Sequence, residues 1–200
     1  MKIFAACQVR LGVFLLFLSS HVIAQSDSAE IELLRQRLID DALVEKGFLN
    51  RTSQYLVSDL ENAADHLRSL QADGSWSDID YQDRDNSWSP LQALTRILIL
   101  TYAYSNPTNK LYHDTKVLSG VERALEYWYQ VNPTCKNWYK NEIAKQFYFN
   151  VIALLLQSEI SEELLQNMIR DLTPTPRMTG SNRTLLSISV LYRGVLERNP

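Results

Sequence analysis

Cysteine is scarce in this sequence of 200 residues, which holds only Cys7 and Cys135. Cys7 belongs to the N-terminal leader described next, so the mature chain keeps a single thiol and cannot form an internal disulfide. As a catalytic nucleophile, Cys135 would need a nearby base, but His66 and His113 both lie far from it in the sequence. We therefore interpret Cys135 as a passive thiol, with the nucleophile as the alternative.

Long hydrophobic runs are missing beyond the first 24 residues. The run Leu11–Leu18 follows two basic residues and precedes the small residues Val22 and Ala24, a pattern typical of a secretory signal peptide cleaved after Ala24. No later segment reaches the ~18 to 20 uninterrupted apolar residues of a membrane-spanning helix. We expect residues 1–24 to be the signal peptide and residues 25–200 to form a secreted or periplasmic domain with no membrane partner.

An excess of positive charge is also absent. The formal net charge is -3, and it becomes -5 once the two basic residues of the leader are removed. This balance gives no support to nucleic-acid binding. From Thr134 to Pro200, however, eight basic residues face six acidic ones. The second half could therefore present a surface to a polyanion, although ordinary solvated helix faces explain much of this excess.

No alternating apolar pattern is long enough to indicate a sheet, whereas helical spacing recurs along the chain. Turn chemistry separates the helical segments near Gly74, Pro107, Pro133 and between Pro174 and Gly180. The segment from Leu91 to Leu100 is apolar on most faces, as an inner-layer helix would be. The apolar series are Leu56, Leu60, Ala63, Leu67 and Leu70; Val117, Val121, Ala124 and Trp128; and Ile143, Phe147, Val151 and Leu155. The fold predicted is all-α, with helical hairpins packed as an α/α toroid or solenoid.

The stretch "NPTCKNWYKNEIAKQF", residues 132–147, places two aromatic residues among polar ones where a loop gives way to a helix. Aromatic rings at such a rim can hold sugar rings, while amides and cations nearby bind the hydroxyl groups. Trp138 and Tyr139 would supply the rings, and Asn137 and Asn141 the amides. The alternative is that Trp138 caps the core and Tyr139 is an ordinary surface ring.

Three stretches, in the same order, resemble the polysaccharide lyases of family eight. They are "NWYKNEI" from Asn137, "QADGSWSDIDY" from Gln71 and "MTGSNRT" from Met178, which are similar to the family's Asn-Trp-Trp-x-x-Glu-Ile, Asp-Gly-Ser-Trp and Thr-Gly-Ala-Asn segments. The resemblance covers nearly all of the mature chain but only the N-terminal α-domain of those much longer enzymes. It implies an incomplete α/α toroid.

The resemblance also implies a function, the cleavage of acidic polysaccharide by β-elimination at a uronic acid. Asn182 would neutralise the substrate carboxylate and thereby acidify the C5 proton, and Trp138 and Tyr139 would hold the sugar chain. The chain departs from the family in two places. Tyr139 replaces the second Trp, and the residues from Lys145 to Phe147 replace a segment in which the family often has a proline.

Asn182 suits this role on physical grounds. It follows Gly180 at the predicted start of a helix, where backbone N–H groups favour an anion, and Arg177 and Arg183 flank it. The alternative is that Asn182 is simply the N-cap of that helix. The candidate site is therefore Asn182 as catalytic residue, with Asn137, Trp138, Tyr139, Asn141 and Arg183 as substrate-binding residues, and with no metal and no cofactor.

The family's proton-abstracting Tyr, its His and its cleft Arg residues have no counterpart in this sequence, and His66 and His113 match no catalytic position. We expect the N-terminal part of a truncated or split lyase, inactive without the missing C-terminal part. The alternative is a non-catalytic carbohydrate-binding helical protein. Chondroitin, hyaluronan and xanthan enzymes share the motifs, so the motifs do not specify the glycan.

Overall fold

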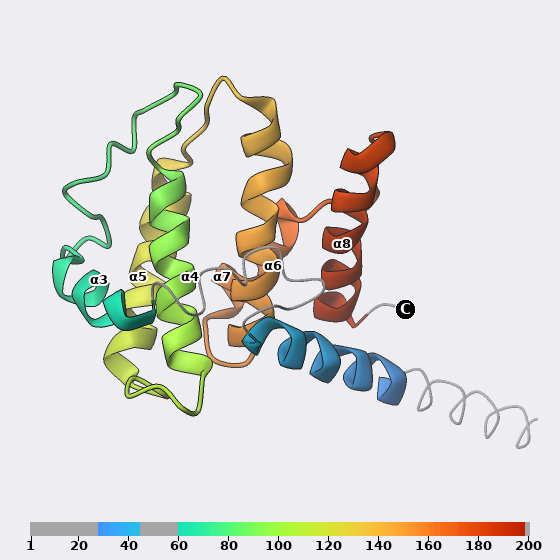
Figure 1. Ribbon diagram of the computed structural model, residues 1–200, viewed down its shortest axis with the longest axis horizontal. Coiled ribbons are helices and arrows are strands. Elements are labelled where there is room, and N and C mark those ends of the chain that lie inside the picture. Colours follow the sequence, from blue (N-terminus) through green and yellow to red (C-terminus); the bar gives the residue numbers. More distant parts are fainter. Residues whose placement is uncertain (1–27, 45–59, 199–200) are drawn as a thin grey trace, which may run out of the picture.

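The computed structural model describes residues 28–44 and 60–198, which form helices joined by turns (Figure 1). A helix over residues 28–43 comes first. It is followed by η1 (Leu60–Asn62), α3 (Ala63–Ser69), α4 (Leu91–Ser105), α5 (Thr115–Val131), the π-helical turn η2 (Lys140–Ala144), α6 (Lys145–Leu156), α7 (Glu162–Asp171) and α8 (Gly180–Glu197). No strand forms among the described residues, where one isolated β-bridge joins Leu70 to Trp76. The predicted all-α class is confirmed; the predicted signal peptide and Leu56 lie outside the described residues.

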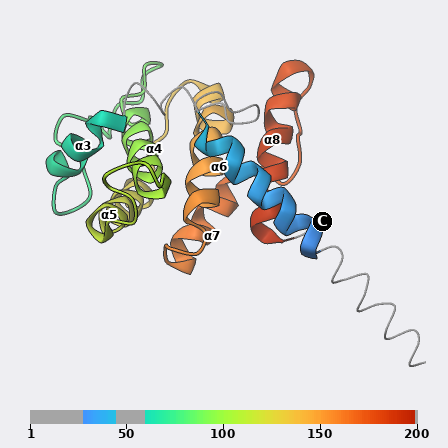
Figure 2. The same cartoon turned by 60° about the horizontal axis from the view of Figure 1, so that its bottom comes forward.

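The helices form two layers of hairpins. In one layer α4 contacts α6 and α6 contacts α8, while α5 contacts α7 in the other, and the hairpins α4–α5 and α6–α7 connect the two (Figure 2). Each hairpin therefore packs on the next one along the chain. This is the arrangement of an α/α toroid, as predicted from the sequence.

Burial separates the inner helices from the outer ones. In α4, ten of 15 residues are buried, and in α6 ten of 12. By contrast, six of the 17 residues of α5 and four of the ten in α7 are buried, each set along one face. A helix that is apolar all round must be covered on all sides, whereas an amphipathic helix keeps one face in water. The prediction that Leu91–Leu100 lies in an inner layer is confirmed.

The helix over residues 28–43 packs on this double layer. Leu38 and Ala42 are buried in the main hydrophobic core. Nε of Arg35 donates a hydrogen bond to Oε1 of Gln157, just after α6, at 3.1 Å. These contacts hold the helix over residues 28–43 against the end of α6.

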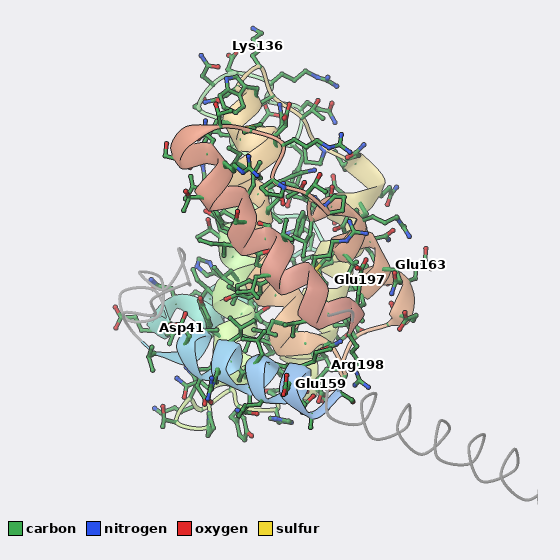
Figure 3. All side chains as sticks on the ribbon, turned by 90° about the vertical axis from the view of Figure 1, so that its right-hand side faces the viewer. Asp41, Lys136, Glu159, Glu163, Glu197 and Arg198 are labelled. Carbon is green, nitrogen blue, oxygen red and sulfur yellow. The ribbon has the colours of Figure 1, made fainter. Side chains whose placement is uncertain are left out.

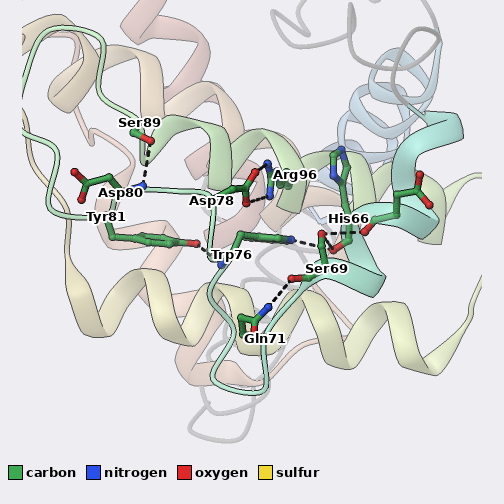
Figure 4. A network of polar contacts seen from close by, with 10 residues as sticks. His66, Ser69, Gln71, Trp76, Asp78, Asp80, Tyr81, Ser89 and Arg96 are labelled. Carbon is green, nitrogen blue, oxygen red and sulfur yellow. Dashed lines mark hydrogen bonds and ion pairs between the residues drawn. The ribbon is translucent and has the colours of Figure 1, made fainter.

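The "DGSW" stretch serves packing. Trp76 is 1% exposed, and its Nε1 donates to the carbonyl of His66 at 2.9 Å (Figure 4). The guanidinium of Arg96 lies 5.5 Å from the centre of the Trp76 ring and binds the Asp78 carboxylate through two nitrogens, at 2.8 and 2.5 Å. Arg96 holds the pKa of Asp78 below its usual range. Through these contacts, Trp76 joins α3 to α4.

Gly74, in the same stretch, lets the loop touch α5. Its φ is +89°, and a Cβ at this position would lie 2.1 Å from the carbonyl oxygen of Arg123. Both features require glycine, because the left-handed conformation is strained for L residues and the neighbouring backbone cannot move aside. The loop and the outer helix are thus in direct backbone contact.

We predict that Gly74→Ala destabilises the protein by about 3 kcal/mol or more, because the added methyl group forces the loop away from α5. Gly180→Ala is the matched control: Gly180 also has a positive φ, +60°, but a Cβ there meets nothing within 4 Å. This control should cost about 1 kcal/mol, the backbone strain alone. Urea denaturation of both variants measures the difference, and equal losses would contradict the prediction.

Candidate functional site

Trp138 and Tyr139 are the first two residues of the helical segment that continues through η2 into α6. Asn137 caps this segment, since its Oδ1 accepts a hydrogen bond from the backbone N–H of Tyr139 at 3.1 Å. The two aromatic rings are 6.2 Å apart and nearly perpendicular, at 81°. The aromatic pair therefore lies at the mouth of a helix, as predicted.

The two rings have different environments. Trp138 is 50% exposed, so it does not cap the core. Tyr139 instead packs, with Met178 and Leu185, against a small buried cluster that consists of Ile143, Phe147 and Leu186. The alternative interpretation, in which Trp138 caps the core and Tyr139 is a surface ring, is therefore reversed. Tyr139 packs against buried residues, and Trp138 is the exposed ring.

Asn182 is the third residue of α8. The helix begins at Gly180 and its N-cap is Thr179, so the alternative that Asn182 is the N-cap is wrong. The Asn182 side chain is half-buried and makes no hydrogen bond among the residues that the structure describes. An amide in the first turn of an 18-residue helix is next to backbone N–H groups that lack helical partners.

The aromatic turn and the start of α8 are neighbours in the fold. Tyr139, Met178 and Leu185 pack against the same buried cluster, and η2 contacts α8. In Figure 3, α8 begins at the end of the molecule where Lys136 lies and ends near Arg198 at the opposite end. The structure thus brings the two predicted motifs to one end of the fold.

Two other predicted substrate-binding residues, Asn141 and Arg183, differ in whether their side chains are already hydrogen-bonded within the protein. Asn141 uses both ends of its side-chain amide on the backbone of Cys135. Arg183 is exposed on the first turn of α8, and its carbonyl accepts a hydrogen bond from the Ser187 hydroxyl at 2.9 Å. The guanidinium of Arg183 has no hydrogen-bond partner among residues 28–44 and 60–198, whereas the Asn141 amide already serves the fold.

Basic side chains border a cavity of about 360 Å³ beside this end. Lys145, Arg170 and Arg177 line it together with the acidic residues Glu142 and Asp171 and the start of α6. Nζ of Lys145 lies 2.8 Å from the Asp171 carboxylate, which neutralises one of these cations. A larger cavity of about 700 Å³ lies between α5 and α7; its lining includes Glu126, Glu163 and Asp171, with Arg170 as the one cation among its described residues. The smaller cavity is the better match for an anionic ligand.

Two parts of this region were not predicted from the sequence to belong to it. They are Gln146 and the loop over residues 82–88. Gln146 is 5% exposed; its Oε1 accepts from the N–H of Thr173 at 2.9 Å, and its Nε2 donates to the carbonyl of Glu142. This side chain ties the segment before α8 to the π-helical turn. The only available signal was that Gln146 lies where the resembling family often has a proline.

Within residues 28–44 and 60–198, no group of His, Cys, Asp and Glu is arranged to hold a metal ion. In the same residues, no helix is both long and apolar enough to cross a membrane.

The fold defines the class of this protein, an α/α-toroid domain. Its family follows from residues 42–200, which match the N-terminal α-helical domain of polysaccharide lyase family 8; the chain belongs to this family. The sequence is 27% identical to the chondroitinase-AC of Pedobacter heparinus over 201 residues, which cover 98% of this chain and 27% of that enzyme. The chain thus spans about a quarter of the length of this relative.

Two solved structures of polysaccharide lyases resemble this fold. A chondroitinase AC lyase, determined as oligosaccharide complexes, superposes with a TM-score of 0.72 at 27% identity, over 84% of this chain and 24% of that one. A Paenibacillus xanthan lyase gives a TM-score of 0.67 at 17% identity, over 85% of this chain and 18% of that one. The second likeness supports the fold alone.

We predict that Gln146→Leu destabilises the protein by about 1 to 3 kcal/mol, because the partly buried N–H of Thr173 loses its acceptor. Gln166→Leu is the control: Gln166 is exposed and bonds only to Glu162 on its own helix. Its cost should stay within about 0.5 kcal/mol. Urea denaturation measures both, and a Gln146 variant as stable as the control would show that this tether is dispensable.

Proposed function

We propose that this chain is the substrate-binding N-terminal part of an exported lyase that degrades acidic polysaccharide by β-elimination. The observation that carries the proposal is that Tyr139, the neighbour of the exposed Trp138, packs on the same buried cluster as Met178 and Leu185, which flank the first turn of α8, in a chain that belongs to polysaccharide lyase family 8. The similarity to a chondroitinase-AC points to a glycosaminoglycan-type substrate.

Trp138 provides the stacking surface in this proposal. Half of the side chain is exposed, while its neighbour Tyr139 is held against buried residues, so the indole face is presented from a fixed backbone. The C–H faces of a sugar ring pack well on such a surface. Asn137 precedes Trp138 in the chain and would bind hydroxyl groups, and the exposed Arg183 in the first turn of α8 would bind acidic groups.

Asn182 would neutralise the uronate carboxylate. Its amide is unpaired among the described residues, and it lies where the first-turn N–H groups of α8 add positive potential. Stabilising the negative charge that develops next to C5 makes its proton easier to remove. An amide neither takes nor gives a proton near neutral pH, so Asn182 serves charge stabilisation alone.

Proton abstraction would need groups outside this chain. The resembling enzymes use a Tyr, a His and cleft Arg residues that have no match here, and this chain covers 27% of its chondroitinase relative. The alternative function is a carbohydrate-binding protein without chemistry, which uses the same aromatic turn. Cleavage assays separate the two only once the remaining part of a lyase is supplied.

Export remains part of the proposal, on the basis of the leader described above. Cleavage after Ala24 would give a mature chain that begins at Gln25. The mass of the protein recovered outside the cytoplasm tests this, and a mass that includes residues 1–24 would contradict it.

We predict that Trp138→Ala weakens the binding of a chondroitin hexasaccharide about 5- to 100-fold, the equivalent of about 1 to 3 kcal/mol, because the stacking surface is removed. Isothermal titration calorimetry measures it. The control is Tyr112→Ala, which removes an exposed aromatic ring that packs beside His113, far along the chain from the site. If both variants bind as tightly as the parent protein, Trp138 is not part of a sugar site.

We also predict that the purified mature chain does not cleave chondroitin sulfate, hyaluronan or xanthan. β-Elimination requires a base, charge neutralisation and protonation of the leaving oxygen, and only the second has a candidate here. The ultraviolet absorbance of the unsaturated uronate product measures cleavage. A steady rise that disappears in Asn182→Ala would reveal a base within this chain.

A further inference from the structure

Asn141 holds the loop that precedes Trp138. Its Oδ1 accepts a hydrogen bond from the N–H of Cys135 at 3.0 Å, and its Nδ2 donates to the carbonyl of the same residue at 2.7 Å. A side-chain amide that pairs with both the donor and the acceptor of one residue fixes the orientation of that residue. The loop is thereby fastened to the helix that Trp138 begins.

Lys140 fastens the same turn to a second loop, residues 82–88. Its Nζ donates to the carbonyl of Ser87 at 2.6 Å. The backbone N–H of Lys136 also donates to the carbonyl of Arg84, at 2.8 Å. Two loops from distant parts of the sequence are therefore joined around the base of Trp138.

The second loop is itself rigidly held. The Asp83 carboxylate accepts hydrogen bonds from the N–H groups of Ser89, at 2.6 Å, and Asp85, at 2.8 Å, and these bonds keep the pKa of Asp83 below its usual range. At the end of the loop, Trp88 has a φ of +49° and is 1% exposed, with its ring 5.9 Å from that of Trp128. Burial holds Trp88 in this strained conformation, so the loop presents the Ser87 carbonyl from a fixed point.

We propose that Asn141 and Lys140 are positioning residues, which hold the Trp138 indole in place for a sugar ring without contacting the sugar. The inference rests on the proposed function of Trp138 in sugar binding, and it removes Asn141 from the predicted substrate contacts. A ring held in its bound orientation loses less conformational entropy when the ligand binds. Positioning residues therefore contribute to affinity without touching the ligand.

The test uses the full-length mature protein labelled with 5-fluorotryptophan. Fluorine NMR gives one resonance for each of the four tryptophans, and Trp138→Phe identifies that of Trp138. In the absence of ligand, Asn141→Ala and Lys140→Met should shift or broaden the Trp138 resonance and leave those of Trp76 and Trp128 in place. Titration calorimetry with a chondroitin hexasaccharide should show a loss of affinity of about 3- to 10-fold.

Three further variants provide the controls. Glu142→Gln changes an exposed side chain in the same turn and should alter neither measurement. Lys136→Met removes the same charge as Lys140→Met. Its ion pair with Asp85 of the second loop has both side chains 75% exposed and so contributes little to holding that loop, and the Trp138 resonance should stay unchanged. Lys140→Arg keeps a long cationic donor to the Ser87 carbonyl and should restore both the resonance and the affinity.

The results separate this inference from the proposed function. A Trp138 resonance in Asn141→Ala that coincides with that of the parent protein overturns the inference; if the affinity is nevertheless lost, Asn141 contacts the sugar directly. A shifted resonance with unchanged affinity overturns it as well. If the parent protein binds no acidic glycan, the proposed function fails, and the ligand-free resonances still decide whether Asn141 and Lys140 position Trp138.

Discussion

Helix α6 is buried on nearly every side, and the arrangement of the other helices follows from the need to cover it. Helices α4, α7 and α8 all contact it, and each large apolar side chain that they remove from water contributes about 1.5 to 3 kcal/mol. Within this core, Nδ2 of Asn150 donates to the hydroxyl of Ser189 at 3.2 Å, whereas Oδ1 of Asn150 has no hydrogen-bond partner among the described residues. Because α8 covers part of α6, this packing fixes the position of α8 relative to the start of α6.

The site is a consequence of this packing. Successive residues of a helix point about 100° apart, so when Tyr139 turns towards the buried cluster of Ile143, Phe147 and Leu186, Trp138 is directed away from it. The π-helical turn η2 then intervenes before α6 begins. Such turns insert an extra residue and change the helix phase, and they are frequent at functional sites. One aromatic ring can thus be exposed directly before a helix that is almost wholly buried.

The sequence was sufficient to predict features that depend on local pattern. Helical periodicity identified Leu91–Leu100 as an inner segment, and turn residues near Gly74, Pro107 and Pro133 located the boundaries. It could not predict contacts between distant segments. The bond of Lys140 to Ser87 spans 53 residues, and that of Gln146 to Thr173 spans 27. Asn141 was predicted to contact the ligand for the same reason. No local pattern shows that its side-chain amide is already hydrogen-bonded to the backbone of Cys135.

The direction of the inner helices concentrates positive potential at one end of the fold. The segments that lead to α4, to the helix beginning at Trp138 and to α8 all lie at the same end of the double layer (Figure 1). Each helix start lies at the positive end of a helix dipole, equivalent to about half an elementary charge. Lys136, Lys140 and Arg183 add full charges near two of these starts. An overall acidic chain can therefore present positive potential where its one exposed tryptophan lies, because backbone direction concentrates that potential independently of net charge.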